Sequence, residues 1–415
     1  MSSLCPERAK AVPADDAHRG PRPCPRLSVA EVLAAALARD RPSLPAPHWK
    51  TLNALLRCRT AALGGHLYAC ADCGRQHFIA HSCRNRHCPQ CQRGAAVDWL
   101  HKQSEALLPV PYFHVVFTLP HALNGLIAQN QRALYNLLFG AASATLLEFG
   151  RNHLQAQVGV TAVLHTWSQT LLDHYHLHCV VTGGGLRLDG HGWRHANRHY
   201  LFPVRALSKV FRGKFCAGLR QLHATGQLGF HGALAPLQDP SAFGRLLAEA
   251  TEGPWVVYSK RPFAGPSTVL AYLSRYTHRV ALGAGRLRAL DRDAGTVRFA
   301  YKDYADHSRS KTLTLTLAEF LRRFCLHLLP ARLVKIRHYG LLGNRDRQQR
   351  LTTVRALLDA ASAPPLRRSP HPEAPPPATP DPPRCPHCGG TRLNLIEHRV
   401  PTRRRPGPPP AFDSS

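Results

Sequence analysis

The chain has 415 residues, of which 44% are hydrophobic, so it is long enough and apolar enough for two or three folded domains. Its 54 Lys and Arg residues against 25 Asp and Glu give a formal net charge of +29, which favours a polyanionic partner, nucleic acid first. No stretch approaches the roughly 20 apolar residues of a membrane span and no signal peptide is evident, so we expect a cytoplasmic protein without a membrane partner.

The first structured segment is expected to be helical. Residues 1–27 are rich in proline and charge, and they are predicted to be disordered. Ser28 followed by Glu31 has the pattern of a capping box and precedes an apolar run, so a helix is predicted to begin there. A second helix is predicted from Trp49 to Ala62, because the glycines at 64 and 65 form a strong stop signal.

The 13 cysteines include two C-x2-C pairs that fourteen residues separate. In a reducing compartment such pairs are metal ligands more often than disulfides, and two of them suit one tetrahedral, structural Zn²⁺ site. Cys83 and the histidines between the pairs stay open as alternate ligands. Arg84 and Arg86, also between the pairs, are predicted to contact DNA phosphates. The predicted zinc ligands are Cys70, Cys73, Cys88 and Cys91.

Helices and strands alternate along the middle of the chain. Glycines 183–185 and the Asp189-Gly190 pair are predicted to mark a hairpin, with residues 186–188 as its returning strand. Pro330 is expected to stop the last helix. Helices are predicted at residues 95–108, 121–157, 205–250 and 317–329, and strands at residues 112–119, 161–167, 297–302 and 311–317.

One predicted strand contains the sequence His174-Tyr-His176-Leu-His178. Because side chains alternate across a strand, the three histidines share one face, and Leu177 and Cys179 point to the opposite, buried face. Two neutral imidazoles held on a rigid strand provide half of a divalent metal site. The alternative is an ordinary His-rich surface in a chain with 26 histidines, and the triplet alone does not decide between the two.

Two tyrosines further along the chain are spaced as neighbours on one helix face. Tyr272 and Tyr276 lie at i and i+4, so their hydroxyls could serve one phosphate in succession. Taken alone, such a pair is more often core packing. Arg275, Arg279 and His278 are interleaved with the pair, which argues against a fully apolar setting, and the two arginines are predicted to contact DNA.

The C-terminal part begins with a basic stretch and ends in a proline-rich one. Lys335 and Arg337 belong to a segment with interleaved aromatic residues that fits DNA backbone contacts. Sixteen of the 35 prolines follow residue 360, which predicts a disordered tail. Cys385 and Cys388 form a single C-x2-C pair without an evident partner pair, and their role stays open.

Taken in order, these blocks resemble the rolling-circle insertion-sequence transposases of the IS91 family, which belong to the HUH endonuclease superfamily. The resemblance extends over about residues 58–350, some seven-tenths of the chain. Its markers are the segment 82–91 with the second cysteine pair, the segment 114–120, the His176-Leu-His178 core, and Tyr272-x3-Tyr276 followed by Thr-His-Arg.

This resemblance implies a metal site and two nucleophiles. His176 and His178 are expected to hold a divalent cation, Mg²⁺ or Mn²⁺, and Tyr272 and Tyr276 to attack DNA. The remaining metal ligand is left open among His174, Gln169, His278 and Cys83. The implied fold is α+β, with a central antiparallel sheet and helices packed on it, preceded by a small helical and zinc-ribbon domain and followed by a disordered Pro-rich tail.

We therefore expect a disordered head (1–27), a helical and zinc-binding domain (28–105), an HUH catalytic domain (106–350) and a Pro- and Arg-rich tail (351–415). The expected activity is metal-dependent cleavage and transfer of single-stranded DNA through 5′-phosphotyrosine intermediates, on the element's ends and target DNA, near the bacterial nucleoid. The alternatives are a plasmid or phage replication initiator or relaxase with the same chemistry, and a zinc-dependent DNA-binding protein without nuclease activity. The oligomeric state, a homo-oligomer included, stays open.

Overall fold

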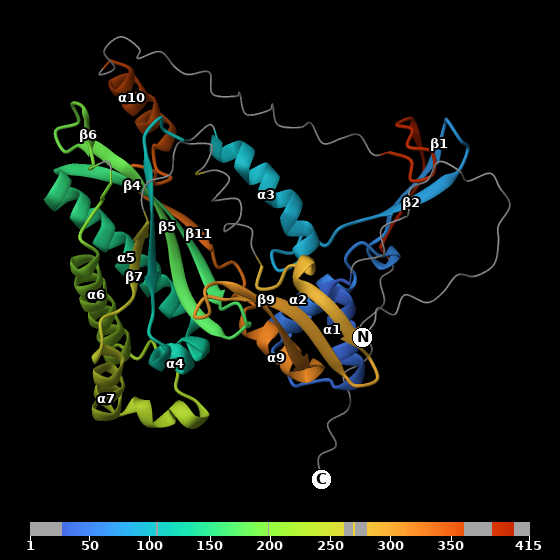
Figure 1. Cartoon of the computed structure of the whole chain (residues 1–415), viewed down its shortest axis with the longest axis horizontal. Coiled ribbons are helices and arrows are strands. Elements are labelled where there is room, and N and C mark those ends of the chain that lie inside the picture. The colour runs from blue at the N-terminus through green and yellow to red at the C-terminus, as the bar shows by residue number, and fades with distance from the viewer. Residues whose placement is uncertain are drawn as a thin grey trace.

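The computed structural model describes residues 27–104, 107–197, 199–260, 269, 280–360 and 384–401, and Figure 1 shows their arrangement. This part of the chain contains three antiparallel sheets with helices packed against them, so the predicted α+β class is confirmed. None of the described helices combines the length and the apolar character that a membrane crossing requires.

The largest sheet is the centre of the molecule. Its order is β11-β4-β5-β3-β7, with β6 beside β5, and every pair of neighbours is antiparallel. β4 and β5 are the longest strands of the sheet, and Val, Leu and Thr residues, which favour pleated structure, recur along both of them. The strands are β3 (Tyr112–Thr118), β4 (Ala156–Trp167), β5 (Asp173–Arg187), β6 (Trp193–His195), β7 (Val257–Lys260) and β11 (Ile336–Gly340).

One face of this sheet is covered by helices. Leu177, Cys179 and Val181 of β5 are fully buried there, together with Phe211 and Phe215, so the predicted buried face of the histidine strand is confirmed. The histidines consequently lie on the opposite face. The helices of this layer and its flank are α4 (Asn124–Gln129), α5 (Gln131–Leu154), α6 (Val204–Ala224) and α7 (Pro240–Thr251), and Figure 1 shows α5, α6 and α7 in green beside the sheet.

The described residues cover the opposite face only in part. Leu351 and Val354 of α10 (Arg347–Ala360) pack in one cluster with Tyr112 and Val180 of the sheet. Val269 is buried in the same cluster. Because Val180 lies two residues beyond His178 on the same face, this cluster covers the end of the face next to the histidines.

A second core joins the N-terminal helices to a distant part of the chain. Leu33 of α1 and Leu52 of α2 are buried with Phe299, Phe320 and Phe324. The first predicted domain (28–105) therefore shares its core with residues 281–328, which we had expected to belong to the catalytic domain. The elements are α1 (Val29–Arg39), α2 (Ala46–Leu56), the sheet β10-β9-β8, and α9 (Leu317–Leu326), with β8 at Leu287–Asp291, β9 at Thr296–Asp303 and β10 at Arg309–Thr316.

The third sheet brings the two ends of the described chain together. β12 (Leu393–Arg399) pairs antiparallel with β1 (Gly65–Cys70), which pairs with β2 (Gln76–Ala80). Figure 1 shows the red C-terminal segment beside β1 and β2. The expectation of a disordered tail is therefore wrong for residues 384–401, because a partner strand more than 300 residues away in sequence satisfies the backbone of β12.

Several predicted elements are confirmed, and others begin or end at different residues than predicted. The capping box forms, with Glu31 N–H donating to Ser28 Oγ at 3.2 Å and Ser28 N–H to Glu31 Oε2 at 2.7 Å. α2 begins and ends earlier than predicted, and α3 spans Pro89–Ser104 instead of 95–108. The glycines at 183–185 do not form a turn. They lie inside β5 because neighbouring backbone approaches so closely that a side chain would collide with it, and the chain turns at Asp189-Gly190.

Candidate active site and zinc centres

Three histidines from two adjacent strands meet on the open face of the central sheet. His165 of β4 pairs in register with His176 of β5, and His178 follows on the same face. Their metal-binding nitrogens all lie within 4.8 Å of one another, and the Nε2 atoms of His176 and His178 are 3.1 Å apart. Three imidazole nitrogens at this separation can bind one divalent ion together.

Hydrogen bonds orient two of these rings. Nδ1 of His176 donates to the carbonyl oxygen of His174 at 2.8 Å, which makes Nε2 the nitrogen with the lone pair that a metal would bind. Nδ1 of His178 lies 2.9 Å from Nε2 of His114 on β3. Burial, together with the nearby charge of Lys260, lowers the pKa of His114 to about 4, so this ring is neutral at neutral pH and able to accept a hydrogen bond. Such partners fix the tautomer and orientation of a metal-binding histidine.

The third member of the cluster, His165, was not among the predicted ligands. Nδ1 of His174 lies 3.4 Å from Nε2 of His121, and the Gln169 amide donates to the Tyr304 hydroxyl at 3.4 Å, so neither joins the cluster. Cys83 lies in a cysteine cluster, and His278 lies outside the described residues. The sequence contains a signal for His165. Only a short connection joins the predicted strand 161–167 to the histidine strand, so the two strands pair and His165 lies beside His176.

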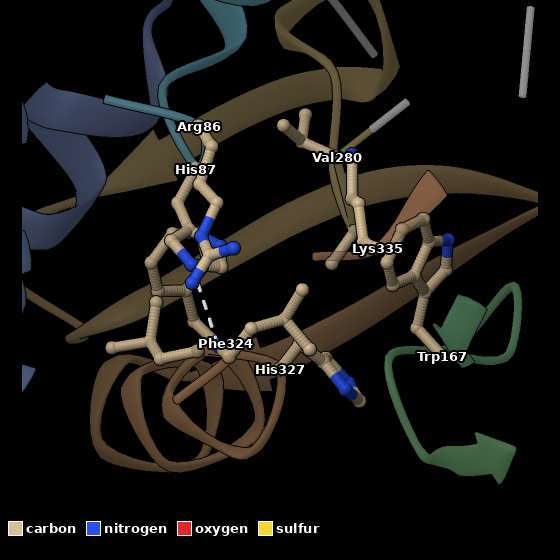
Figure 2. A pocket seen from close by; sticks show the side chains of 10 residues that line it. Arg86, His87, Trp167, Val280, Phe324, His327 and Lys335 are labelled. Carbon is tan, nitrogen blue, oxygen red and sulfur yellow. Dashed lines mark hydrogen bonds between the residues drawn. The ribbon is translucent and has the colours of Figure 1, made fainter. Parts of the chain in front are cut away.

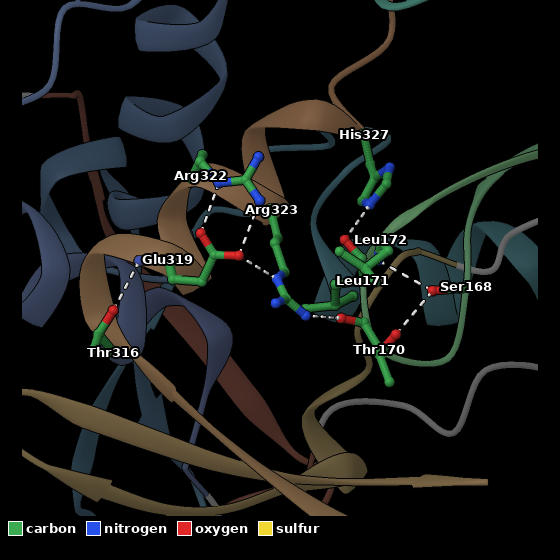
Figure 3. Close-up of polar contacts among 9 residues, drawn as sticks. All are labelled: Ser168, Thr170, Leu171, Leu172, Thr316, Glu319, Arg322, Arg323 and His327. Atoms are coloured by element: carbon green, nitrogen blue, oxygen red, sulfur yellow. Dashed lines mark hydrogen bonds and ion pairs between the residues drawn. The ribbon is translucent and has the colours of Figure 1, made fainter. Parts of the chain in front are cut away.

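The turn between β4 and β5 is fixed by side chains from the second core. Arg286, Arg323 and His327 donate to three successive backbone carbonyls, those of residues 169, 170 and 171. Glu319 in turn holds Arg323 at 2.6 Å, and Figure 3 shows this chain of contacts from α9 to the turn. The pKa of Glu319 falls to about 2, chiefly because its hydrogen bonds to Arg322 and Arg323 stabilise the carboxylate. The second core thus positions the histidine hairpin.

A small cavity of about 20 Å³ is lined by residues of the N-terminal module (residues 27–104), of β4 and of the segments around residues 280, 327 and 335. Trp167, which stacks on His165 with ring centroids 4.7 Å apart, forms one wall, and His87 and Lys335 contribute to the lining (Figure 2). Burial lowers the pKa of Lys335 to about 8 and that of His87 to about 3, because a charge is poorly solvated there. Val280 also lines this cavity.

Two predicted DNA contacts are engaged inside the protein. Arg86 donates to the carbonyl oxygen of Pro330 at 2.6 Å and to that of Leu333. This arginine joins the N-terminal module to the segment before β11, and the prediction that it contacts DNA is not supported. The ammonium group of Lys335 likewise faces the cavity instead of open solvent.

The other predicted DNA contacts are placed differently. Arg84 is exposed. Arg337 lies over the Phe139 ring at 4.1 Å and donates to Asn136 Oδ1 at 2.6 Å, on the wall of an open cavity of about 410 Å³ that Arg132 and Arg332 also line. The predicted nucleophiles and the arginines interleaved with them lie outside the described residues, namely Tyr272, Tyr276, Arg275 and Arg279.

Eight of the described cysteines form two clusters of four. The predicted grouping of Cys70, Cys73, Cys88 and Cys91 into one site is wrong. Cys88 and Cys91 gather with Cys58 and Cys83, while Cys70 and Cys73 do not belong to this group. Three Sγ pairs in it, including Cys58 with Cys91 and Cys83 with Cys91, are each 3.6 Å apart. Four sulfurs about 2.3 Å from one zinc ion would lie about 3.8 Å apart, so the arrangement fits a tetrahedral zinc site.

The second cluster closes across the length of the chain. Cys70 and Cys73, at the turn between β1 and β2, meet Cys385 and Cys388, the pair for which the sequence offered no partner. Their Sγ atoms pair at 3.6 Å (Cys70 with Cys388) and 3.7 Å (Cys73 with Cys385). The prediction missed Cys58 and this pairing. The number of cysteines indicates a second site, because the six cysteines within residues 58–91 and Cys385 and Cys388 make eight, enough for two four-cysteine sites.

Comparison with known proteins identifies the family to which the chain belongs. Residues 159–350 match a family model described as "Putative transposase", and residues 29–119 match one described as "Transposase zinc-binding domain". "Putative transposase y4qJ" of Sinorhizobium fredii is 47% identical over 318 residues, 76% of this chain and 79% of that protein. "Transposase for insertion sequence element IS801" of Pseudomonas savastanoi pv. phaseolicola is 30% identical over 345 residues, 82% of this chain and 81% of that protein.

Among solved structures, the metal-bound conjugative relaxase TrwC in complex with oriT DNA aligns with 27% of this chain and 44% of the relaxase chain. The aligned part is 18% identical, with a TM-score of 0.23.

Proposed function

We propose, from the premise that the chain belongs to the IS91 family of transposases with an N-terminal zinc-binding domain, that it cleaves and rejoins single-stranded DNA at the ends of an insertion element. The observation that carries this proposal is the group of His165, His176 and His178 on the open face of the central sheet. A transposase needs a centre for phosphoryl transfer, and among the described residues this group is suited to that chemistry.

The donor set fits a divalent cation. His165, His176 and His178 supply three imidazole nitrogens, and hydrogen bonds from the outer nitrogens of two rings support the orientation. We propose Mg²⁺ or Mn²⁺ as the ion; three nitrogen ligands favour Mn²⁺ in affinity, whereas Mg²⁺ is more available. When bound, the ion would polarise the scissile phosphate and offset the charge that develops on its oxygens.

The segment with the tyrosines begins and ends close to the histidines. Lys260, the last residue of β7, pairs in register with His114, and Val280 lines the small cavity together with Trp167. Val269, between these two points, packs in the same cluster as Val180, two residues beyond His178. These three anchors support the proposal that Tyr272 and Tyr276, which lie between residues 269 and 280, act at the histidine cluster.

In the proposed reaction the tyrosine hydroxyl attacks the phosphorus atom and loses its proton. The bond from phosphorus to the 3′ oxygen breaks, and that oxygen leaves as a 3′ hydroxyl after taking up a proton. The 5′-phosphotyrosine link conserves the energy of the phosphodiester, so joining to a new 3′ hydroxyl needs no nucleotide cofactor. A second tyrosine allows a second strand to be held while the first is still attached.

The charge of the chain supports binding of the element's single-stranded ends and of target DNA in the cytoplasm. The open cavity that Arg132, Arg332 and Arg337 line offers cationic groups beside the central sheet. We propose that the cavity and the exposed Arg84 contact the DNA backbone, and that Arg275 and Arg279 do so near the scissile phosphate.

A cleavage assay tests the proposal. Labelled single-stranded DNA that carries the element's end is incubated with the protein and Mn²⁺ or Mg²⁺, and covalent adducts are resolved on a denaturing gel. We expect an adduct that requires metal and that the double variant Tyr272→Phe/Tyr276→Phe abolishes while DNA binding persists. Tyr304→Phe is the matched control, because Tyr304 is 68% exposed and lies outside the histidine strands and the segment with Tyr272 and Tyr276.

Two results would contradict the proposal. Adducts that persist in the double variant would refute the tyrosine assignment. Binding of the correct end sequence without any adduct, in both metals, would instead support a DNA-binding protein without nuclease activity.

A further inference from the structure

A third group of histidines lies on the small sheet that joins the two ends of the chain, far from the central sheet. His66 of β1 pairs in register with His398 of β12, so their side chains point to the same face. His81 follows directly after β2, and its N–H donates to the carbonyl oxygen of Gly64. By strand alternation, it lies on the face that Ile79 and His66 share. Three separate segments thus each contribute one imidazole to the same patch.

The rings are close enough to bind one ion. Their candidate ligand nitrogens all lie within 4.8 Å of one another. The ring centroid of His66 lies 4.8 Å from the ring centroid of His81 and 4.8 Å from that of His398. The Nε2 atoms of His81 and His398 are 3.4 Å apart. Two nitrogens bound to a single zinc ion at about 2.0–2.1 Å in tetrahedral geometry would be about 3.3 Å apart. The pair of nitrogens therefore already has the separation that a shared metal would impose.

Among the described residues, no carboxylate lies on this face to pair with the three imidazoles. The neighbouring carboxylate, Glu397, pairs with Arg399 at 3.0 Å, and it is in register with Leu67, whose side chain points to the other face of the sheet. Nδ1 of His66 is buried and lacks a hydrogen-bond partner among the described residues. A buried ring nitrogen without a partner is costly, and a metal ion or the water bound to it would satisfy this group.

We propose that His66, His81 and His398 form a third transition-metal site of the N-terminal module, which takes Zn²⁺ or a similar borderline ion. Nitrogen ligands suit Zn²⁺, and three of them leave a fourth position for water, which the exposed side chain of His398 keeps accessible. The site is distinct from the cluster of Cys70, because Cys70 lies four positions along β1 from His66, about 13 Å at the spacing of a strand.

The position of the site gives it a role in the fold. Two of its ligands come from residues 66–81 and one from β12, so a bound ion would tie the C-terminal strand to the N-terminal module. The cysteine cluster of residues 70, 73, 385 and 388 does the same at the other end of the three-stranded sheet. With both sites filled, β12 is held on β1 at two points.

Metal stoichiometry of the full-length protein tests the proposal. To remove the ion expected at the central sheet, all variants carry His176→Gln and His178→Gln, and each is loaded with ¹¹³Cd²⁺ for metal analysis and NMR. We expect three tightly bound equivalents, two giving signals typical of four-sulfur sites and one typical of a nitrogen-rich site. His66→Gln/His398→Gln should lose one equivalent and only the nitrogen-type signal.

His77→Gln is the matched control, since His77 lies on the same sheet but stacks on Tyr68 outside the cluster. The control should keep three equivalents of Cd²⁺. The single variant His398→Gln changes an exposed side chain and therefore tests the site with the least risk to folding. Amide hydrogen exchange of residues 393–399 should quicken in His398→Gln and not in the control. The proposal would be overturned if the parent protein with His176→Gln and His178→Gln bound only two equivalents of Cd²⁺. It would also be overturned if the histidine variants lost Cd²⁺ from the sulfur sites in parallel with the nitrogen-rich site.

Discussion

His114 offers a test of how the central site is organised, because it touches a candidate ligand but does not belong to the cluster itself. For Nε2 of His178 to present a lone pair to a metal, its Nδ1 must carry the proton and donate to Nε2 of His114, 2.9 Å away. His114→Leu removes that acceptor from a place where the side chain is only 5% exposed. An N–H left buried without an acceptor costs about 1–3 kcal/mol.

That cost appears as weaker metal binding. Since 1.4 kcal/mol corresponds to a factor of ten, we expect the metal affinity to fall by about 10- to 100-fold, the range found when such supporting partners are removed. Titrating Mn²⁺ into the protein by calorimetry, and following adduct formation against Mn²⁺ concentration, measures this shift. Saturating Mn²⁺ should restore most of the activity, because His114 positions a ligand and does not touch DNA in this scheme.

Two further variants sharpen the test. His114→Gln keeps an oxygen acceptor and should recover part of the lost affinity, whereas His174→Gln, on the same strand as His178 but outside the cluster, should bind Mn²⁺ like the parent protein. Equal affinities for His114→Leu and the parent, with circular dichroism unchanged, would refute the assigned hydrogen bond. An equal loss in His174→Gln would show that the effect is not specific to the site.

Three other predictions concern stability and the zinc centres. The pKa of Glu319 is about 2 against an ordinary 4.5, so its contribution to stability is fully present above pH 4.5 and is lost as the pH falls toward 2. Glu319→Gln should therefore lower the unfolding free energy by about 1 kcal/mol at pH 7 and flatten the dependence of this free energy on acid pH, which denaturant titrations would detect. Cys58→Ser and Cys385→Ser should each remove one zinc equivalent, and the double variant should remove two; a loss of only one in the double variant would contradict the separate clusters. Gly340→Ala should destabilise the protein by about 1–2 kcal/mol in thermal unfolding, since Gly340 has φ +59° and its added Cβ would meet the Val158 carbonyl, whereas Gly244→Ala, in open space on α7, should not.

Local patterns in the sequence predicted the local structure well. The capping box at Ser28, the strand at residues 112–119 and the buried face of the histidine strand follow from interactions within a few residues, and all three are confirmed. The same holds for the pairing of His176 with His178, because strand alternation alone puts them on one face. The family resemblance added the expectation of an antiparallel sheet, which is also confirmed.

The error in grouping the cysteines involves partners far apart in the chain. Cys70 and Cys88 look like neighbours in one zinc site because they are close in sequence, yet Cys70 gathers with Cys388 and Cys88 gathers with Cys58. Which strand lies beside which is decided by the global packing. The number of cysteines allows two sites, but the spacing within residues 58–91 does not say which cysteines share one. The glycines at 183–185 failed for a related reason: they accommodate the backbone of residues 111 and 157, not a turn.

The shared second core leads to a last prediction, which bears on the domain boundaries. If residues 106–350 were an independent catalytic domain, they would fold without the N-terminal helices. In the structure, however, Val32, Leu33, Leu52 and Leu55 of α1 and α2 are at most 2% exposed and pack against residues of α9 and β9. At about 1.5–3 kcal/mol for each buried side chain, these four contribute about 6–12 kcal/mol, close to the whole stability of a typical domain.

We therefore expect a fragment of residues 106–350 to be unfolded or aggregated when expressed alone. Co-expression with residues 27–104 should rescue it, as size-exclusion chromatography and thermal unfolding would show. The side chains at the β4–β5 turn make the same point for function: Arg286, Arg323 and His327 belong to the part of the chain that builds the second core, and they hold the hairpin that carries His165 and His176. A fragment that melts cooperatively at the temperature of the full chain would refute this account. It would mean that the catalytic sheet keeps its histidines in place without the N-terminal module.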